Sequence, residues 1–379
     1  MRLGFDGKRA TQNFRGLGNY SRGIIEGLLD YSEEELYLYS PLVKDARAQQ
    51  WLKDNENERL ILKVPNSTIE QKVPSLWRSF SIIRDLKRDD LDIYHGLSHE
   101  IPFGVLSNAK MKTVVTIHDL IFLRYPEFFP LIDRMTYKKK FSYAGLNADM
   151  VIAICEQTKR DLVEFLNIDE RKILVHYQSC DPVFYVERVF EEKKSLMRKY
   201  SFERPFILNV GAFEERKNQL NLIEAFSKIA TQVEQDLVLI GNGKKYLEEC
   251  KKMVEDKKLG HRVHFLSNVP FSELPLFYQT ADLFCFPSHF EGFGLPIVEA
   301  LFSKTPVITS FGSCFPESAG PDSVYIDPLS VQDISDKIVK VLNDVTLQEV
   351  MINKGYQFVQ KFHRKNVTEK LLECYARLF

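Results

Sequence analysis

Two carboxylates and two glycines stand close together in residues 288–300, which read SHFEGFGLPIVEA. Gly292 and Gly294 let backbone amides approach a ligand closely, and the proline that follows is typical of the first turn of a helix. A phosphate binds well at such a helix N-terminus, because the first N–H groups have no partner within the helix. Glu291, before the expected helix, and Glu299, within it, are left to accept hydrogen bonds from hydroxyls. The segment predicts a site for an anionic, hydroxyl-rich ligand, and sugars supply such hydroxyls.

Adjacent cations form a second candidate in the same half of the chain. Arg216 and Lys217 follow an expected strand at 206–210 and a glycine turn, and Asn218 is expected to cap the next helix. An Arg fork beside a Lys point charge can hold a diphosphate. Adjacent basic residues are more commonly solvated surface, but their combination with the glycine turn favours a function here.

The first half of the chain offers two weaker candidates. Gly16 and Gly18 lie between an expected strand at 2–5 and an apolar helix, so they predict a second phosphate-facing loop, although the full GxGxxG pattern is absent. His118 ends an expected strand at 112–117, which places its imidazole at the carboxyl edge of the sheet. A lone histidine in such a place is more often structural.

Metal and cofactor chemistry find no support in the sequence. Residues 90–92 match a DxD pattern formally, but they precede their strand, at the edge opposite the expected ligand side, so a solvated role is favoured. The HExxH, EF-hand, GxSxG and Walker-type patterns do not occur. We expect no metal site and no bound cofactor.

The bulk composition is that of an ordinary globular protein. The 379 residues exceed the size at which single cores stop growing, so two domains are expected. A formal net charge of −1 argues against a nucleic-acid partner. The six cysteines show no metal-ligand spacing, and they are expected to be reduced and buried. Neither a signal-like segment nor an apolar run of about 18 residues occurs, which favours a cytoplasmic protein.

Short apolar strands alternate with helical patterns in two series. This alternation predicts an α/β fold with parallel sheets that are covered on both faces. The expected domains are residues 1–185 and 205–358, with a charge-dense linker at 186–204 and a C-terminal helix at 359–379 that packs back toward the first domain.

Residues 128–141 combine large apolar side chains with three consecutive lysines. This combination is typical of a peripheral contact with an anionic membrane, at the inner face in a cytoplasmic protein. An ordinary amphipathic helix with a lysine-rich solvent side explains the pattern equally well.

Several of these motifs, in this order, are those of a known family. The chain resembles the retaining glycosyltransferases of family 4, which have the GT-B architecture of two Rossmann-like parallel-sheet domains facing across a cleft. The resemblance covers nearly the whole chain and rests on GLGNY at 16–20, TIHD at 116–119, the glycine turn with RKN at 211–218, LIGNG at 239–243 and EGFGLP with EA at 291–300. The chain departs from the family pattern at Ala212, commonly Arg, and at Cys155, commonly Ser.

The resemblance implies a role for each candidate residue. Glu299 would bind the ribose of a nucleotide-sugar donor, and Glu291 would contact the transferred hexose. The donor site would further include Arg216 and Lys217 on the diphosphate, the amides of Phe293, Gly294 and Leu295, and Val269 in the turn that lines the base. Gly16, Gly18 and His118 would approach from the first domain. The residues expected to take part in catalysis are Glu291, His118, Arg216 and Lys217.

The resemblance therefore implies a retaining, metal-independent hexosyltransferase. Its donor would be a GDP- or UDP-hexose, with mannose favoured, and its acceptor a hydroxyl of a growing surface glycan or a lipid-linked oligosaccharide. A non-catalytic nucleotide-sugar-binding regulator or scaffold of a polysaccharide assembly complex is the alternative, and a GT-B sugar phosphorylase is a second one.

Overall fold

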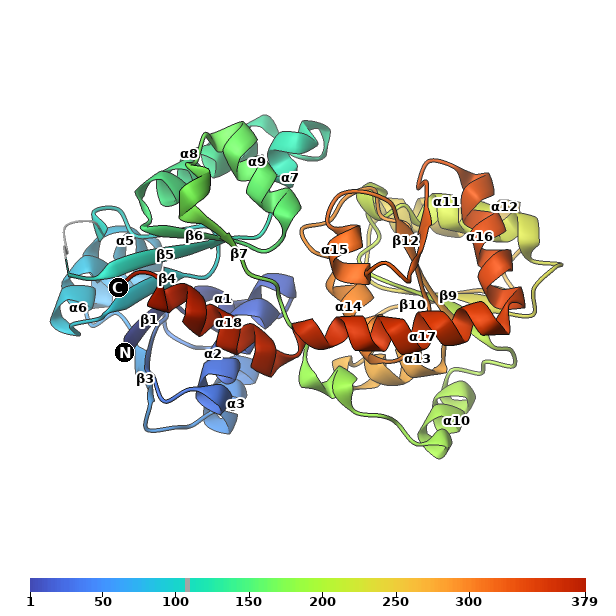
Figure 1. Cartoon of the computed structure of the whole chain (residues 1–379), viewed down its shortest axis with the longest axis horizontal. Coiled ribbons are helices and arrows are strands. Elements are labelled where there is room, and N and C mark those ends of the chain that lie inside the picture. Colours follow the sequence, from blue (N-terminus) through green and yellow to red (C-terminus); the bar gives the residue numbers. More distant parts are fainter. Residues whose placement is uncertain (106–109) are drawn as a thin grey trace. The chain divides into compact units, whose positions relative to one another are not determined.

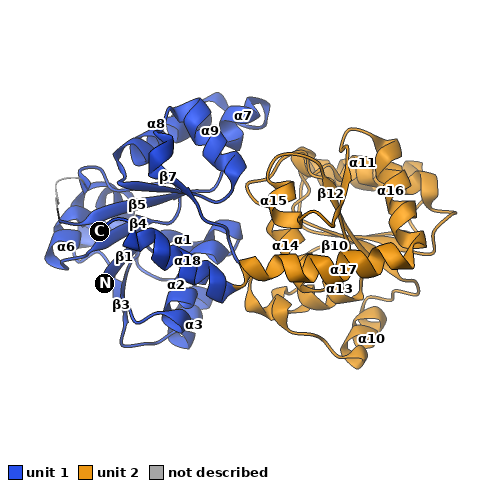
Figure 2. Ribbon diagram, in the orientation of Figure 1, with its two compact units in different colours: residues 1–179, 364–379 blue, residues 180–363 orange. Residues whose placement is uncertain are grey.

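The computed structural model describes residues 1–105 and 110–379, and it divides into two compact units (Figures 1 and 2). Unit 1 consists of residues 1–179 and 364–379, and unit 2 of residues 180–363. Both termini therefore lie in unit 1. The last helix, α18 (Arg364–Ala376), packs there beside α2 (Gly16–Tyr31).

Unit 1 is built on a seven-stranded sheet in which every strand pair is parallel. In spatial order its strands are β3 (Leu60–Lys63), β2 (Glu35–Tyr39), β1 (Arg2–Asp6), β4 (Ile93–Gly96), β5 (Lys112–Ile117), β6 (Met150–Ala153) and β7 (Ile173–Val175). The helices, besides α2 and α18, are α1 (Lys8–Gln12), α3 (Ala46–Asp54), α4 (Thr68–Lys72), α5 (Pro74–Leu76), α6 (Ile82–Arg88), α7 (Ile121–Arg124), α8 (Leu131–Asn147) and α9 (Glu156–Leu166). A π-helical turn, η1 (Trp77–Ser81), joins α5 to α6.

Helices cover both faces of this sheet (Figure 1). One core lies under α6, α8 and α9, and a second lies under α2 and α18. The central strands are buried on both faces, which explains why their sequences are apolar without alternation.

Unit 2 is built on a six-stranded parallel sheet. In spatial order its strands are β10 (Val263–Leu266), β9 (Asp236–Ile240), β8 (Phe206–Val210), β11 (Leu283–Phe286), β12 (Val307–Ser310) and β13 (Val324–Ile326). Its helices are α10 (Phe190–Lys199), α11 (Gln219–Ile229), α12 (Lys245–Asp256), α13 (Leu274–Thr280), α14 (Leu295–Phe302), α15 (Phe315–Ala319), α16 (Val331–Asn343) and α17 (Val345–Val359). The predicted α/β class with parallel sheets is confirmed.

The two sheets share one strand order, and each has a point where the direction of winding reverses. In unit 1 the reversal lies between β1 and β4, and in unit 2 it lies between β8 and β11. The loops that leave the carboxyl ends of such a strand pair run in opposite directions and leave a crevice between them. Ligands of open α/β sheets bind in this crevice, so each unit has one favoured place for a site.

The six cysteines are reduced and all are buried, as expected. In the described part of the chain no helix is both long and apolar enough to span a membrane.

Candidate active site

Two loops of unit 2 meet at the reversal point of its sheet. Residues 211–218 follow β8, and residues 287–294 follow β11, its neighbour. The backbone N–H of His289 donates to the carbonyl of Arg216 at 2.8 Å, which ties one loop to the other. The fold thus brings together two segments that are about 75 residues apart in the chain.

A carboxylate held by two cations forms the centre of this site. Glu291 Oε2 lies 2.7 Å from Arg216 Nη1, and Glu291 Oε1 lies 2.8 Å from Lys217 Nζ. Ser288 Oγ also donates to Oε1, at 3.1 Å. The three charged side chains are only 12–16% exposed. Because cations outnumber carboxylates in this buried group, it carries a net positive charge that suits an anion.

The protonation state of Glu291 follows from this geometry. Burial raises the pKa of its carboxyl, but Lys217 and Arg216 oppose burial and together lower the pKa to about 2. Glu291 is therefore ionised throughout the physiological range. Both of its oxygens are occupied by donors, so it is poorly placed to act as a nucleophile.

Close packing around Gly211 positions the lysine. A Cβ at residue 211 would lie 3.0 Å from Lys217 Cδ, so glycine leaves room for the lysine stem to cross the turn. The ammonium group then lies 5.0 Å from the centroid of the Phe286 ring, at the end of β11. The ring face attracts the cation and helps to fix it.

Asn218 differs from its prediction. It adopts a left-handed conformation, with φ +61°, and its side chain makes no capping hydrogen bond to α11. Its amide donates to the carbonyls of Pro287 (3.1 Å) and Pro328 (2.7 Å) instead. The capping prediction was wrong because a capping Asn has an extended backbone and accepts through Oδ1 from the first helical N–H groups, whereas Asn218 is left-handed and its amide is anchored to these two carbonyls.

The start of α14 has the predicted form. Gly294 precedes the helix with φ +89°, a conformation that glycine adopts without strain, and no side chain caps the helix there. A Cβ at Gly294 would also lie 3.1 Å from Ile297 Cδ1. The amide of Leu295 therefore stands at an uncapped N-terminus, whereas the Phe293 side chain is buried against Phe362.

Glu299 lies one turn into α14 and has a different environment from Glu291. The Tyr278 hydroxyl donates to Glu299 Oε2 at 2.8 Å. Burial raises the pKa of Glu299 to about 7; the Tyr278 hydrogen bond opposes the rise and Asp181 adds to it. Glu299 therefore titrates near neutral pH, and a ligand that donates hydrogen bonds to it would favour the ionised form.

Two family models match consecutive parts of this chain. The model of glycosyltransferase family 4 matches residues 15–183, and the model of glycosyl transferases group 1 matches residues 192–358. O-antigen chain mannosyltransferase B of Escherichia coli is 28% identical over 379 residues, which cover 96% of each chain. The chain belongs to the family 4 glycosyltransferases.

Solved structures place this glycosyltransferase in the GT-B fold. The Anabaena protein HepE, in complex with UDP and glucose, covers all of both chains with a TM-score of 0.79 at 17% identity. Sucrose-phosphate synthase from Thermosynechococcus elongatus also has a TM-score of 0.79, at 18% identity, and covers 100% of this chain and 99% of its own. At such identities the similarity concerns the fold alone, and the predicted pair of Rossmann-like parallel-sheet domains is confirmed.

The remaining expected donor residue of the glycosyltransferase lies further along the sheet edge. Val269 is half-buried in the loop after β10, which is separated from β8 by β9. The fold therefore places Val269 at the same carboxyl edge as Arg216 and Lys217, but outside the cation cluster.

The expected residues of the first domain lie in unit 1. Gly16 and Gly18 belong to the first turn of α2 and not to a loop before it, and the side chain of the N-cap residue Arg15 makes no capping hydrogen bond. A Cβ at Gly18 would lie 1.6 Å from the Asn13 carbonyl oxygen, so close packing requires glycine there. Gly16 has open space around it.

His118 of the glycosyltransferase is buried beside β5. Its Nε2 donates to the Leu97 carbonyl at 3.0 Å, so the neutral ring carries its proton on Nε2. Burial lowers the pKa of His118 to about 4; the bond to Leu97 opposes this shift, and Arg9 adds to it. At neutral pH the ring is uncharged and interacts through its hydrogen-bonding atoms, not through a positive charge.

Two contacts of the glycosyltransferase site were not predicted. Tyr278, which hydrogen-bonds Glu299, stands on a different helix, so no local spacing links the two residues. Ser288 precedes Glu291 by three residues in the same turn, and this spacing was a usable signal. Among the described residues, no group of three or more His, Cys, Asp or Glu side chains is arranged to hold a metal ion.

Proposed function

We propose that the protein transfers a hexose from a nucleoside diphosphate sugar to a hydroxyl acceptor with retention of the anomeric configuration. The observation that carries this proposal is the paired cations Arg216 and Lys217, held on Glu291 beside the uncapped N-terminus of α14. Two fixed cations and a helix N-terminus stabilise the charge that develops on a departing diphosphate. Because these groups supply the positive charge, the reaction needs no metal ion.

In the proposed step, the hexose passes from the diphosphate to the acceptor hydroxyl. The bond between the anomeric carbon and the diphosphate oxygen breaks, and the electron pair leaves with the diphosphate. The acceptor oxygen bonds the anomeric carbon on the same face, and its proton passes to the leaving phosphate oxygen. Glu291 positions the two cations and the sugar, since both of its oxygens already accept from donors. The configuration of the product, read by NMR, tests this step, and an inverted product would refute it.

The other candidate residues take their expected roles in this proposal. Glu299 accepts hydrogen bonds from the ribose hydroxyls, and the amides at Phe293, Gly294 and Leu295 face the sugar and the phosphates. Val269 lines the base, while Gly16, Gly18 and His118 belong to unit 1.

We favour GDP-mannose as the donor and a growing surface glycan, free or lipid-linked, as the acceptor. The mannosyltransferase relative supports mannose, whereas the HepE neighbour was solved with UDP and glucose. A thermal-shift panel of GDP-, UDP- and ADP-sugars separates these donors, because a ligand at 100 times its Kd adds about 2.7 kcal/mol of stability. A product assay with and without EDTA then tests transfer and its metal independence. A panel in which no nucleotide sugar raises the melting temperature would refute the proposal.

Peripheral membrane contact through residues 128–141 is part of this proposal and would place the enzyme at the inner face of the membrane. Leu131, Ile132 and Met135 are 64–78% exposed at the start of α8, and Lys138 and Lys139 are exposed on its next turn. Apolar side chains that enter the acyl boundary and lysines that meet anionic headgroups favour such a contact.

Flotation with vesicles tests this contact. The protein should float with vesicles that contain anionic lipid and stay behind with zwitterionic ones. Ile132→Ser and the pair Lys138→Glu with Lys139→Glu should each abolish flotation, whereas Lys340→Glu, at an exposed site on α16, should not. Failure of the unmodified protein to bind anionic vesicles would remove the membrane contact.

A further inference from the structure

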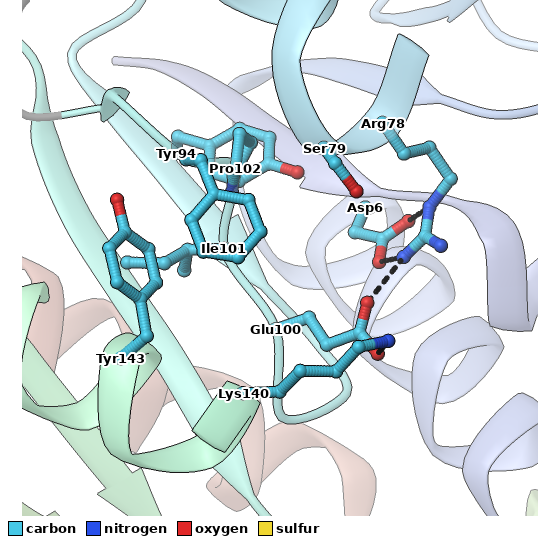
Figure 3. Close-up of a pocket in the computed structure, with 10 residues that line it drawn as sticks. Asp6, Arg78, Ser79, Tyr94, Glu100, Ile101, Pro102, Lys140 and Tyr143 are labelled. Carbon is cyan, nitrogen blue, oxygen red and sulfur yellow. Dashed lines mark hydrogen bonds and ion pairs between the residues drawn. The ribbon is translucent and has the colours of Figure 1, made fainter. Parts of the chain in front are cut away.

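Unit 1 carries a pocket at the carboxyl edge of its own sheet (Figure 3). Asp6 is the last residue of β1, and Glu100 and Phe103 belong to the loop after β4. Arg78 from the π-helical turn η1 and Lys140 from α8 also line the pocket. The pocket therefore occupies the reversal point between β1 and β4, the position that the cation cluster occupies in the sheet of unit 2.

Four charged side chains of alternating sign run from the bottom of this pocket to its mouth (Figure 3). Arg78 Nη2 lies 2.5 Å from Asp6 Oδ2 and 3.7 Å from a carboxylate oxygen of Glu100, and Lys140 Nζ lies 3.0 Å from the other Glu100 oxygen. The exposed fraction rises from 4% at Asp6 to 44% at Lys140. The inner pair is thus fixed by burial, while the outer pair meets solvent.

The charges that line this pocket balance, and this limits what it can bind. Each lining cation is already paired with a lining carboxylate, so neither is left to attract a phosphate, and Lys8, whose charge also acts on Asp6, Arg78 and Glu100, does not line the pocket. The carboxylates accept hydrogen bonds, the cations donate them, and the two kinds of group lie close together. A neutral hydroxyl can donate to one and accept from the other. Neighbouring hydroxyls on one sugar ring match such an arrangement.

Exposed aromatic rings adjoin the charged groups. Phe80 and Phe103 stack with their ring centroids 5.4 Å apart and an interplanar angle of 21°, although their side chains are 55% and 37% exposed. Phe103 also packs against Tyr143, whose hydroxyl accepts from the N–H of Gly104 at 3.0 Å. The negative faces of aromatic rings attract the slightly positive C–H face of a pyranose. The pocket thus presents polar groups for one side of a sugar and a ring face for another.

The loop that carries Glu100 and Phe103 is held in a strained shape. His99 has φ +65° and is buried, with its ring stacked 4.3 Å from that of Phe141. A left-handed conformation at such a residue costs about 1–3 kcal/mol and marks a place where the surroundings dictate the shape. A Cβ at Gly96 would lie 2.0 Å from the Glu100 carbonyl oxygen, so the loop also depends on glycine. The pocket is therefore preorganised.

We propose that this pocket binds one neutral hexopyranose residue of the acceptor glycan. Its hydroxyls pair with Glu100 and Lys140, and its C–H face lies against the exposed ring of Phe103. The cavity volume is only about 30 Å³. One edge of the sugar enters, and the rest of the ring stays at the mouth. The inference rests on the proposed transferase function, since it names the acceptor side of the reaction.

Saturation-transfer NMR on the full chain tests the pocket. The probes are the methyl α-pyranosides of mannose, glucose, galactose and N-acetylglucosamine, together with α-linked mannose disaccharides. At least one probe should receive saturation, and its affinity should fall about tenfold or more in Phe103→Leu and in Lys140→Ala. Phe103→Tyr keeps the ring face and should bind as the unmodified protein does. Phe190→Leu and Lys87→Ala, at exposed sites elsewhere, are the matched controls and should leave binding unchanged.

Two results would overturn the pocket assignment: no probe binds the unmodified protein, or the Phe103→Leu and Lys140→Ala variants bind as well as the controls do. Thermal shift with nucleotide sugars on the same samples reads unit 2 separately. If donors bind and no glycan binds, the pocket assignment is refuted and the proposed function stands. If a glycan binds and no donor binds, the proposed function is refuted and the pocket assignment stands. In transfer assays, the two variants should raise the acceptor KM and leave the donor KM unchanged.

Discussion

Unit 1 and unit 2 each place a charged cluster at the reversal point of a parallel sheet, but the two clusters differ in charge balance. In unit 2, the buried Arg216 and Lys217 share the single buried carboxylate of Glu291, while Glu214, 3.3 Å from Arg216, is 53% exposed and screened by solvent. In unit 1, the four charged groups that line the pocket cancel. In our proposals, the same backbone position therefore serves an anion in one unit and neutral hydroxyls in the other. The fold thus determines where on the sheet a ligand binds, and the side chains at that place determine which ligand charge is favoured.

Removing a cation from unit 2 is the strongest test of this contrast. We expect Lys217→Ala and Arg216→Ala each to lower kcat by about 10²–10³, because a preorganised charge on the leaving group is lost. Lys340→Ala, an exposed site on α16, is the control and should keep full activity. Steady-state kinetics at saturating donor measures the effect. Near-normal turnover in either variant would mean that unit 2 does not use its excess charge for catalysis.

Removing the shared carboxylate should affect stability more in unit 2 than in unit 1. Glu291→Gln leaves two buried cations facing each other, so we expect a loss of about 2–4 kcal/mol in the free energy of unfolding. Glu100→Gln, whose side chain is 31% exposed, should cost about 0–1 kcal/mol. Denaturant titration compares the two variants.

The same pair of variants gives a charge-specific readout. Inorganic pyrophosphate should raise the melting temperature of Glu291→Gln more than that of the unmodified protein, since it replaces the missing negative charge. It should have no such effect on Glu100→Gln. Equal responses of the two variants would erase the distinction between the clusters.

Glu299 adds a pH dependence that belongs to unit 2. Its pKa rises from 4.5 in the unfolded chain to about 7 in the folded one. The associated stability is therefore fully present below about pH 4.5 and is lost as the pH rises through about 7, because the folded state holds the extra proton. We expect Glu299→Gln to flatten the change in stability between pH 5 and 8, by about 2–3 kcal/mol over that range. Thermal unfolding across this range in both proteins is the measurement, and identical pH profiles would contradict the assignment.

Donor binding should show the opposite trend at the same carboxylate. In the proposed function, ribose hydroxyls donate to ionised Glu299, so donor affinity should increase several-fold from pH 6 to pH 8. Glu299→Gln should remove this increase, which titration calorimetry at several pH values can measure. Methyl glycoside binding in unit 1 should stay constant over the range, because it does not involve Glu299.

The smallest expected effect on activity concerns Gly211. A Cβ there meets the flexible stem of Lys217 at 3.0 Å, so the lysine has to shift by a few tenths of an ångström. We expect Gly211→Ala to raise the donor KM a few-fold and to cost about 1–3 kcal/mol of stability, because φ +159° at Gly211 is a conformation that residues with a Cβ rarely adopt. Gly16→Ala, which meets open space, is the matched control. A loss of kcat as large as that of Lys217→Ala would mean that the turn itself, and not the lysine position, limits activity.

Strand and helix positions were largely readable along the chain. The predicted strands 2–5, 112–117 and 206–210 coincide with β1, β5 and β8 to within one residue, because their apolar character is strong. The end of unit 2 was missed. Strand β13 has only three residues, too few for a clear apolar pattern. Helix α16 does carry a signal, because Ile334, Ile338 and Val341 recur at helical spacing.

The sequence by itself identified the charged residues of the proposed donor site, because Arg216, Lys217, Glu291 and Glu299 lie in short segments with glycine turns and a helix start. Only the tertiary structure decided how these groups pair: which carboxylate holds both cations, and which one is raised in pKa by burial beside Tyr278. The pocket of unit 1 had no signal in the sequence at all. Its charged groups come from four distant segments, and only the winding of the sheet brings them to one edge.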